Sequence, residues 1–240
     1  MTHQIFHDDS YQESFTALVS GYNDQNHGLI LDQTAFYPGG GGQPSDHGWL
    51  FFNGNEIQLR SVKIISGEIV HILPDEVSLP EQGSSLEGKL DWIRRYQLMR
   101  THTAMHILCG TIFRDYGASV TGGNMEPLKG RMDFEFASLK KELVQTIENS
   151  VNLEIKKSLP VSWRVIPRAE AFQIPDLIRT KINLLPPQIS EVRIVEITDL
   201  DLQADGGTHV KNTNEVGGVK ITDYKSKGRD NKRIYLEVIG

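Results

Sequence analysis

The 240-residue sequence contains a single cysteine, Cys109, and no long run of apolar residues. One cysteine excludes an internal disulfide framework and agrees with a reducing compartment. No segment approaches the ~18 consecutive apolar residues of a membrane-spanning helix. The first residues lack a basic stretch followed by an apolar one, so they do not indicate a signal peptide. We therefore expect a cytoplasmic protein with no membrane partner.

Basic residues are in the minority. The chain has 25 Lys and Arg against 31 Asp and Glu, which gives a formal net charge of -6. This net negative charge is not typical of a protein that binds nucleic acids. Two local basic groups could still attract phosphates: the stretch from Lys220 to Arg233, and Arg94, Arg95 and Arg100. Charge runs of this kind are more often solvated faces.

The chain also lacks a phosphate-binding P-loop. Residues 39–42 are all glycine, but Gln43 follows them in place of the Gly-Lys-Ser/Thr ending, which argues against nucleotide hydrolysis. The tripeptide formed by residues 41–43 also occurs in peptide release factors, which cleave an ester on tRNA. A match of three residues has little weight, and a glycine-rich surface turn is an equal alternative.

Residues 1–90 consist of short strand-like segments separated by turn residues. Asn-Gly-Asn at residues 53–55 and Ser-Gly at 66–67 are hairpin signals. We predict a small N-terminal antiparallel β-barrel over 1–90. Its predicted strands cover residues 28–33, 48–52, 57–65, 68–73 and 86–91.

From residue 91 the apolar spacing becomes helical, which indicates a second domain over 91–240. Helices segregated from an antiparallel sheet would make it an α+β domain. Pro160 should end its second long helix. The predicted helices cover 92–113, 140–159 and 169–177, and the predicted strands cover 131–136, 161–166, 191–197 and 233–238.

The most informative residues are two histidines in the first predicted helix. His102 and His106 are four positions apart, so both imidazoles lie on one face and can converge on one ion. Zinc sites use three or four His, Cys, Asp or Glu ligands, usually from different parts of the chain. Asp205 and His209, in the segment Asp-Gly-Gly-Thr-His, supply a second pair from a predicted loop. Together the four residues predict one metal site.

A simpler interpretation of the histidine pair stands beside the metal site. A pair of histidines four apart can be ordinary helix residues with satisfied ring nitrogens. Cys109 shares their helix face and is a reserve ligand, although a small buried packing residue is the more common role at such a position. The five remaining histidines are expected to be ordinary surface or strand residues: His3, His7, His27, His47 and His71.

Four motifs together resemble a known family. They are the segments 31–46, 100–108, 205–210 and 213–217, which contain the glycine run, the histidine pair, the Asp-Gly-Gly-Thr-His sequence and Thr-Asn-Glu-Val-Gly. In this order and spacing they resemble the AlaX proteins, freestanding relatives of the alanyl-tRNA synthetase editing domain. The resemblance covers nearly the whole chain, and the N-terminal domain makes it similar to the medium-length form.

The resemblance implies trans-editing, the hydrolysis of the ester that joins serine or glycine to tRNA(Ala). A site built for alanine cannot strongly reject glycine or a side chain that only adds a hydroxyl, so a second hydrolytic site supplies the discrimination. The implied cofactor is Zn²⁺. Its ligands would be His102, His106, Asp205 and His209, although many relatives carry Cys at the third place and Asp offers a harder oxygen ligand.

The residues leave several choices open. The ion could orient the substrate or activate the attacking water. The polar candidates for the catalytic site are Gln203, Thr208, Thr121, Thr34 and Gln43. Two alternative functions are a tRNA-binding or regulatory module without turnover and a zinc hydrolase of small esters or amides. The pattern gives no indication of an oligomeric state.

Overall fold

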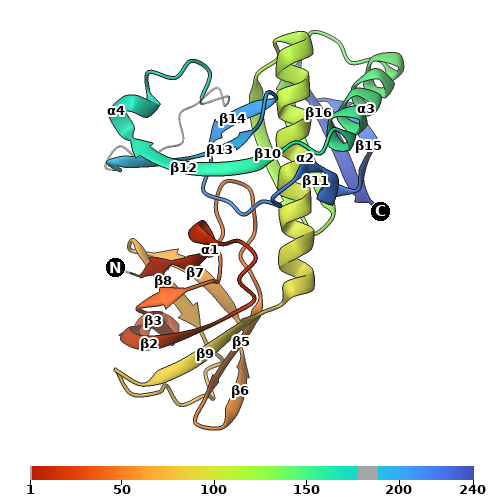
Figure 1. Cartoon of the computed structure of the whole chain (residues 1–240). Coiled ribbons are helices and arrows are strands. Elements are labelled where there is room, and N and C mark those ends of the chain that lie inside the picture. The colour runs from red at the N-terminus through yellow and green to blue at the C-terminus, as the bar shows by residue number, and fades with distance from the viewer. Residues whose placement is uncertain (1, 178–188) are drawn as a thin grey trace. The chain divides into compact units, whose positions relative to one another are not determined.

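A computed structural model describes residues 2–177 and 189–240. The chain forms two compact units, unit 1 (Met1–Gln97) and unit 2 (Leu98–Gly240). The predicted mixture of helices and sheets is confirmed, and the chain has several sheets and few helices (Figure 1). Within the described ranges, no helix combines the length and the apolar character needed to cross a membrane.

Unit 1 is built on a seven-stranded antiparallel sheet with the order β6-β5-β9-β2-β3-β8-β7, beside the short parallel pair β1-β4. Its short helical segments are α1 (Ile5–Asp8) and the 3-10 turn η1 (Asp24–Asn26). Its strands are β1 (His3–Gln4), β2 (Ser14–Asn23), β3 (Gly28–Leu31), β4 (Gln33–Thr34), β5 (Gly48–Phe52), β6 (Asn55–Gln58), β7 (Ser61–Ile65), β8 (Glu68–Ile72) and β9 (Ser85–Leu90).

The predicted closed barrel is not confirmed. Strands β6 and β7 end the order, and among the described residues each pairs with a single neighbouring strand. The segment 57–65, predicted as one strand, is divided between them. Leu59 donates its N–H to Gly48 on the β5 side, whereas Arg60 donates to Ile72 on the β8 side, both at 2.9 Å. The chain therefore changes partner strand between these two residues.

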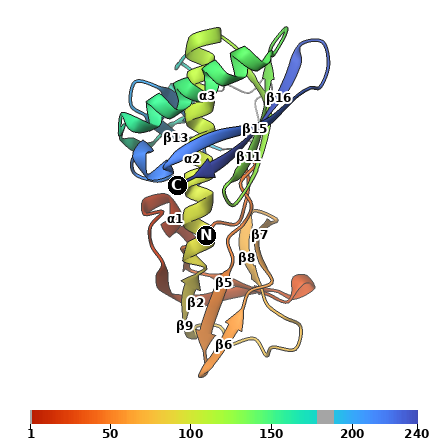
Figure 2. The ribbon, with the colours of Figure 1, turned by 90° about the vertical axis from the view of Figure 1, so that its right-hand side faces the viewer.

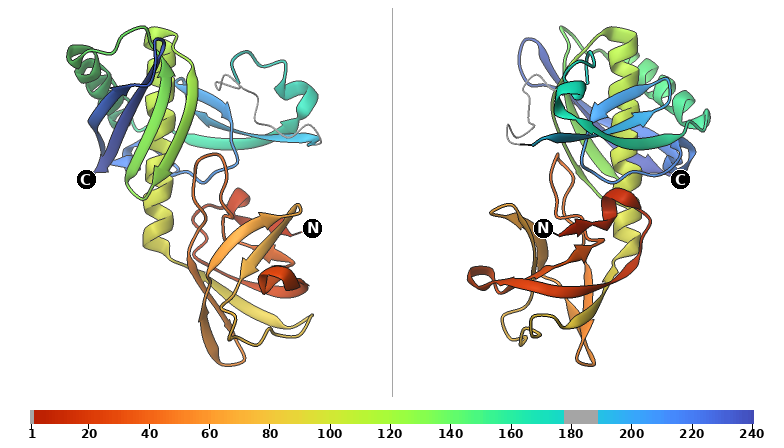
Figure 3. Two further views of the ribbon diagram at one scale, coloured as in Figure 1. Left: turned by 180° about the vertical axis from the view of Figure 1, so that it is seen from behind. Right: turned by 60° about the vertical axis from the view of Figure 1, so that its left-hand side comes forward.

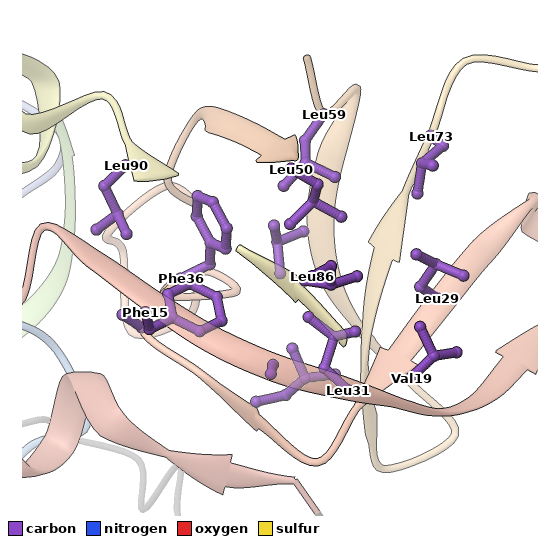
Figure 4. Packing of buried hydrophobic residues seen from close by; sticks show 14 of the residues in the cluster. Phe15, Val19, Leu29, Leu31, Phe36, Leu50, Leu59, Leu73, Leu86 and Leu90 are labelled. Atoms are coloured by element: carbon purple, nitrogen blue, oxygen red, sulfur yellow. The ribbon is translucent and has the colours of Figure 1, made fainter. Parts of the chain in front are cut away.

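Strand β2, which was not predicted, holds the sheet of unit 1 together. Its first half pairs with β9 and its second half with β3, with a register shift between Val19 and Gly21. Phe15, Ala17 and Val19 alternate inward and are buried. Figure 4 shows Phe15 and Val19 among the leucines of this core. Gly88 is required opposite Phe15, because a Cβ there would lie 2.4 Å from the ring.

A buried ion pair lies beside this core. Arg95 and Asp46 are almost fully buried, and the guanidinium Nε lies 3.0 Å from both carboxylate oxygens. Arg95 Nη1 also donates to the carbonyl of Ser10 at 2.9 Å. Asp46 in turn accepts the N–H of Tyr37 at 2.6 Å. The pair therefore joins the start of helix α2 to the glycine-rich turn that precedes β5.

Unit 2 is organised around helix α2 (Trp92–Tyr116), whose first residues belong to unit 1. Its other helices are α3 (Lys141–Lys156), α4 (Arg168–Ala171) and the 3-10 turn η2 (Thr213–Val216). The strands form a sheet of order β10-β11-β16-β15 and a sheet of order β12-β13-β14. They are β10 (Val120–Glu126), β11 (Lys129–Glu135), β12 (Val161–Pro167), β13 (Glu191–Ile197), β14 (Asp201–Ala204), β15 (Gly218–Ser226) and β16 (Asn231–Ile239).

Helix α2 lies between the two sheets of unit 2 (Figure 3). On one side Met105 packs so closely that a Cβ at Gly130 would lie 2.9 Å from its sulfur. On the other side a Cβ at Gly110 would lie 2.7 Å from the carbonyl oxygen of Leu200. The helix runs three residues beyond its predicted end and stops where Gly117 takes a positive φ of 64°.

Helix α3 runs along β15, the edge strand of the four-stranded sheet (Figure 2). Asn152 accepts the N–H of Val219 at 2.9 Å and donates to its carbonyl at 2.7 Å. This helix side chain therefore pairs both backbone polar groups of Val219 on the edge strand. The helix ends at Lys156, three residues before its predicted end, as the chain turns at Ser158 with a φ of 55°.

Two further expectations for unit 2 were wrong in detail. The helix predicted over 169–177 is the single turn α4, and Pro175 disfavours a helical conformation at the residue before it. Strands β10, β14 and β15 were not predicted. Of these, β14 has the greatest consequence, because it carries polar residues toward helix α2.

Candidate metal centre

The four residues predicted as metal ligands come together in unit 2. His102 and His106 lie one turn apart on α2, and Asp205 and His209 follow β14, which stands beside that helix (Figure 1). One ligand atom from each residue lies within 4.8 Å of the others. The cluster is shielded, since all three histidines are buried and Asp205 is half-buried.

The side chains of the cluster face one another. Ring centroids of the three histidines are 4.3–5.0 Å apart. Asp205 Oδ2 lies 2.9 Å from Nε2 of His209, and its Oδ1 lies 3.5 Å from Nε2 of His102. Three imidazoles and one carboxylate in this arrangement can hold a divalent metal ion.

A second layer of residues fixes the ring of His106. Its Nδ1 lies 2.9 Å from Oδ2 of the buried Asp201, and Gln203 donates to the same oxygen at 2.6 Å. A carboxylate only accepts hydrogen bonds, so Nδ1 carries the proton and Nε2 keeps its lone pair. Carboxylates in this position orient metal-binding histidines and raise their basicity. Asp201 therefore gives His106 the tautomer that a metal ligand needs.

His209 has a corresponding partner in Thr103. The hydroxyl oxygen of Thr103 lies 3.3 Å from Nδ1 of His209 and accepts the N–H of Val210 at 3.2 Å. A threonine hydroxyl both donates and accepts, so it satisfies either tautomer of the imidazole. Thr103 thus links helix α2, which carries the other two histidines, to the end of the segment 205–209. This segment is called the ligand loop below.

The ligand loop is also held from its N-terminal side. Arg193 Nη1 donates to the carbonyls of Asp205 and Gly207, both at 3.1 Å. The N–H of Gly207 donates to Oδ2 of Asp205 at 2.7 Å, which is the local side-chain turn that aspartate favours. The carboxylate of Asp205 is thereby oriented by its own backbone before any ligand binds.

The electrostatics of the cluster favour metal binding. Burial lowers the pKa of His209 to about 4 and holds the pKa of His102 well below its ordinary value. Burial alone would raise the pKa of Asp205, but the nearby His102 and the hydrogen bond from His209 outweigh it, so this pKa falls well below its usual range. Neutral imidazoles and an ionised carboxylate are the forms that coordinate metals.

The ligand atoms lie within 4.8 Å of one another, and the pair of His209 Nε2 and Asp205 Oδ2 is 2.9 Å apart. Tetrahedral coordination with bonds of about 2.0–2.2 Å places ligand atoms roughly 3.3–3.5 Å apart. The 3.5 Å separation of His102 Nε2 and Asp205 Oδ1 already matches this value. The cluster does not include Cys109, which is buried on α2.

The remaining predicted site residues occupy different places. Gln203 is next to the cluster through Asp201, and Thr208 is fully buried within the ligand loop. Thr121 lies on β10, where its hydroxyl donates to Asn231 at 3.1 Å. Asp201, Thr103 and Arg193 were not predicted from the sequence. For Asp201, the alternation of Asp201, Gln203 and Asp205 at every second position was the available signal.

Thr34 and Gln43 belong to unit 1. The hydroxyl of Thr34 lies 2.9 Å from Nε2 of the buried His71 and accepts the N–H of Phe36 at 3.1 Å. Gln43 is buried and exchanges two backbone hydrogen bonds with Gly40. The four glycines of residues 39–42 all have positive φ, a conformation that glycine adopts without steric cost.

The basic groups are less available than the sequence suggests. Arg95 is buried against Asp46, and Arg100 donates to the carbonyls of Val216 and Gly240. Lys232 is also buried, and its ammonium donates to two carbonyls in the hairpin between β15 and β16. These three cations therefore act within the fold.

Two family models match the chain. Residues 192–235, which contain β14 and the ligand loop, match the model described as the threonyl and alanyl tRNA synthetase second additional domain. Residues 4–94 match the model for class II (A) tRNA synthetases. The two matches fall in unit 2 and unit 1, respectively.

Similar proteins span the full length. The chain is 40% identical to the alanyl-tRNA editing protein AlaX-M of Saccharolobus solfataricus over 99% of both chains. It is 36% identical to AlaX-M of Methanosarcina acetivorans over the whole of both chains. It is also 36% identical to the alanine–tRNA ligase of Pyrobaculum neutrophilum, but only over 25% of that enzyme. By its full-length identity to these freestanding proteins, the chain belongs to the AlaX-M family of alanyl-tRNA editing proteins.

Proposed function

We propose that this protein hydrolyses the ester bond of mischarged tRNA(Ala) in trans. The observation that carries the proposal is the cluster of His102, His106, Asp205 and His209, which has the composition of a metal site and converging ligand atoms. Full-length identity to AlaX-M proteins supports alanyl-tRNA as the substrate class. The reaction takes place wherever tRNA is charged, which we take to be the cytoplasm.

The substrates in this proposal are Ser-tRNA(Ala) and Gly-tRNA(Ala). An alanine site gains little against glycine, which lacks one methyl group, or against serine, which only adds a hydroxyl. A separate hydrolytic site therefore has to remove both errors. We assign this role to residues 91–240 and assign a supporting role to residues 1–90.

Zn²⁺ is the proposed cofactor, because three imidazoles and a carboxylate suit this ion. When bound, zinc supplies positive charge that can orient the substrate or lower the pKa of water. His102, His106, Asp205 and His209 would hold it, while Asp201 and Thr103 fix the rings of His106 and His209. Gln203 and Thr208 are our candidates for the wall that contacts the amino acid, since Gln203 is hydrogen-bonded to Asp201 and Thr208 directly precedes His209.

Thr121, Thr34 and Gln43 have a weaker case as catalytic residues. The hydroxyls of Thr121 and Thr34 are engaged with Asn231 and His71, respectively. Gln43 is buried in the glycine-rich turn. We propose that these three residues act through the local structure and that substitution at any one of them affects folding more than turnover.

The test is hydrolysis of the serine, glycine and alanine esters of tRNA(Ala) by purified protein, with zinc content determined on the same sample. Rapid loss of the serine or glycine ester with the alanine ester spared is the expected result. An absence of turnover by fully zinc-loaded protein that still binds tRNA would favour a binding module. Asp205 in place of the cysteine of many relatives motivates that second candidate.

A further inference from the structure

An exposed tryptophan lies at the edge of the sheet that lines the metal cluster. Trp163 is in β12, the outer strand of the β12-β13-β14 sheet, and remains 41% exposed. It pairs with Val195, which pairs in turn with Gln203. Directly paired residues point to the same face of a sheet. Trp163 therefore shares a face with Gln203 and with Asp201, which supports His106.

The distance from this tryptophan to the cluster suits a nucleotide. Neighbouring strands lie ~4.8 Å apart, so the backbone of Trp163 is about 10 Å from that of Gln203. The amino acid of an aminoacyl-tRNA is esterified to the ribose of the last nucleotide. Its base is therefore one sugar away from the bond to be cleaved, and a base at Trp163 places the ester near the histidines.

A cation connects Trp163 to the ligand loop. The guanidinium carbon of Arg193 lies 5.3 Å from the centroid of a Trp163 ring. The same guanidinium donates to the carbonyls of Asp205 and Gly207. Arg193 therefore fixes the orientation of the indole relative to the loop that carries two of the proposed ligands.

The chemistry of this surface matches an unpaired base. Proteins that bind single-stranded nucleic acids combine exposed aromatic rings, on which bases stack, with positive charge along the backbone. The adjacent Val165 is on the same face and is 48% exposed, which extends the apolar surface beside the ring. Arg193 adds the positive charge that complements a phosphate.

We propose that Trp163 and Arg193 form a stacking platform for the unpaired 3′-terminal nucleotide of the substrate. The platform holds the base while the ester reaches the cluster of His102, His106, Asp205 and His209. This inference rests on the proposed function, because it names the part of the tRNA that the same site contacts.

The experiment compares Trp163→Ala with Trp163→Phe, which keeps an aromatic ring. Phe172→Ala is the matched control, because Phe172 is also an exposed aromatic beside an arginine, Arg168 at 4.7 Å, but lies next to α4. We expect Trp163→Ala to raise the KM for Ser-tRNA(Ala) about 5- to 100-fold, as the loss of one base stack predicts, with kcat and zinc content unchanged. Trp163→Phe should recover most of the affinity, and Phe172→Ala should match the wild type.

Binding of an uncharged RNA hairpin separates this inference from the proposed function. The wild type should bind a hairpin with unpaired 3′ nucleotides more tightly than a blunt one, and Trp163→Ala should lose that difference. If the wild type hydrolyses Ser-tRNA(Ala) but Trp163→Ala keeps its KM, the platform is refuted and the proposed function stands. If no ester is hydrolysed, the proposed function fails and the hairpin result alone decides for or against the platform. A change of oligomeric state in Trp163→Ala would assign this surface to contacts between copies and overturn the inference.

Discussion

Both units of this protein bury polar side chains, but they use them in opposite ways. In unit 1, Arg95 and Asp46 neutralise each other, and the ring of His71 has a partner at each nitrogen, Thr34 at 2.9 Å and the carbonyl of Leu29 at 3.2 Å. A buried polar group whose hydrogen-bonding atoms are paired in this way does not require a bound ion or ligand. Its role is to fix the packing of the strands that surround it.

In unit 2 the buried polar side chains converge. Three histidines and Asp205 direct ligand atoms toward one another, while partners such as Asp201 and Thr103 hold the outer sides of the rings. Such a concentration of lone pairs is expensive to bury unless it binds a cation. The comparison teaches that burial and a lowered pKa do not identify a functional site. His71 and His209 both have a pKa of about 4, and the direction of their partners distinguishes them.

The largest effect should come from breaking the convergent cluster. His209→Ala removes one ligand of four, so we expect zinc content to fall below stoichiometry and deacylation of Ser-tRNA(Ala) to fall by more than about 100-fold. His71→Gln is the matched control, since it replaces a buried histidine of similar pKa in the other unit. Metal analysis and single-turnover assays on both variants check the prediction. Full metal content in His209→Ala would remove this residue from the ligand set.

Breaking the buried ion pair of Arg95 and Asp46 in unit 1 should lower stability and leave the metal centre intact. Asp46→Ala strands the buried Arg95 guanidinium, which should lower the free energy of unfolding by about 3–5 kcal/mol. The exposed pair of Asp75 and Arg60 gives the control, because Asp75→Ala should cost less than about 1 kcal/mol. Urea denaturation measures both effects, and zinc content should not change. Equal costs for the two variants would contradict the role of the buried pair.

Acid should destabilise unit 1 through His71. Burial lowers the pKa of this residue from 6.5 to about 4, so the folded state keeps the neutral ring while the unfolded state takes up a proton. The stability due to this group is complete above pH 6.5 and is lost as the pH falls toward 4, by up to about 3 kcal/mol at 1.36 kcal/mol per pH unit. Unfolding measured between pH 7 and 4 should show a shallower decline in His71→Gln. An identical decline in both proteins would place the acid sensitivity elsewhere.

The smallest effect should come from the second layer of the metal centre. Asp201→Asn keeps the size of the side chain but removes the charge that fixes the tautomer of His106, so zinc affinity should fall about 10- to 100-fold. Competition with a chelator of known affinity measures the change. Gln203→Ala removes only the neighbouring amide and should weaken zinc binding less. A reversed order for these two variants would show that the amide, and not the carboxylate, positions the ring.

The sequence predicted which four residues come together better than it predicted the residues around them. The spacing of His102 and His106 depends only on helix geometry, and Asp205 and His209 are recognisable ligand types. Asp201 and Thr103 were not predicted, because their function depends on which strand and which loop come to lie beside α2. A single sequence does not contain that pairing.

The fold was predicted unevenly for a similar reason. Helix α2 depends on hydrogen bonds between residues close in the sequence and was expected within three residues of its end. The sheet of unit 1 depends on long-range pairing, and its main connecting strand, β2, contains serine and glycine that obscure the alternation of Phe15, Ala17 and Val19. A closed barrel would require β6 and β7 to pair with each other. Pairing between two edge strands depends on the whole sheet, so the sequence of either strand does not indicate it.

The central claim is that the convergent cluster of unit 2 acts through a bound metal. The most direct measurement removes zinc from the wild-type protein with a chelator, follows hydrolysis of Ser-tRNA(Ala), and then restores one equivalent of zinc. We predict that activity disappears with the metal and returns with it, while circular dichroism and tRNA binding stay unchanged. Full activity in verified metal-free protein would contradict the claim.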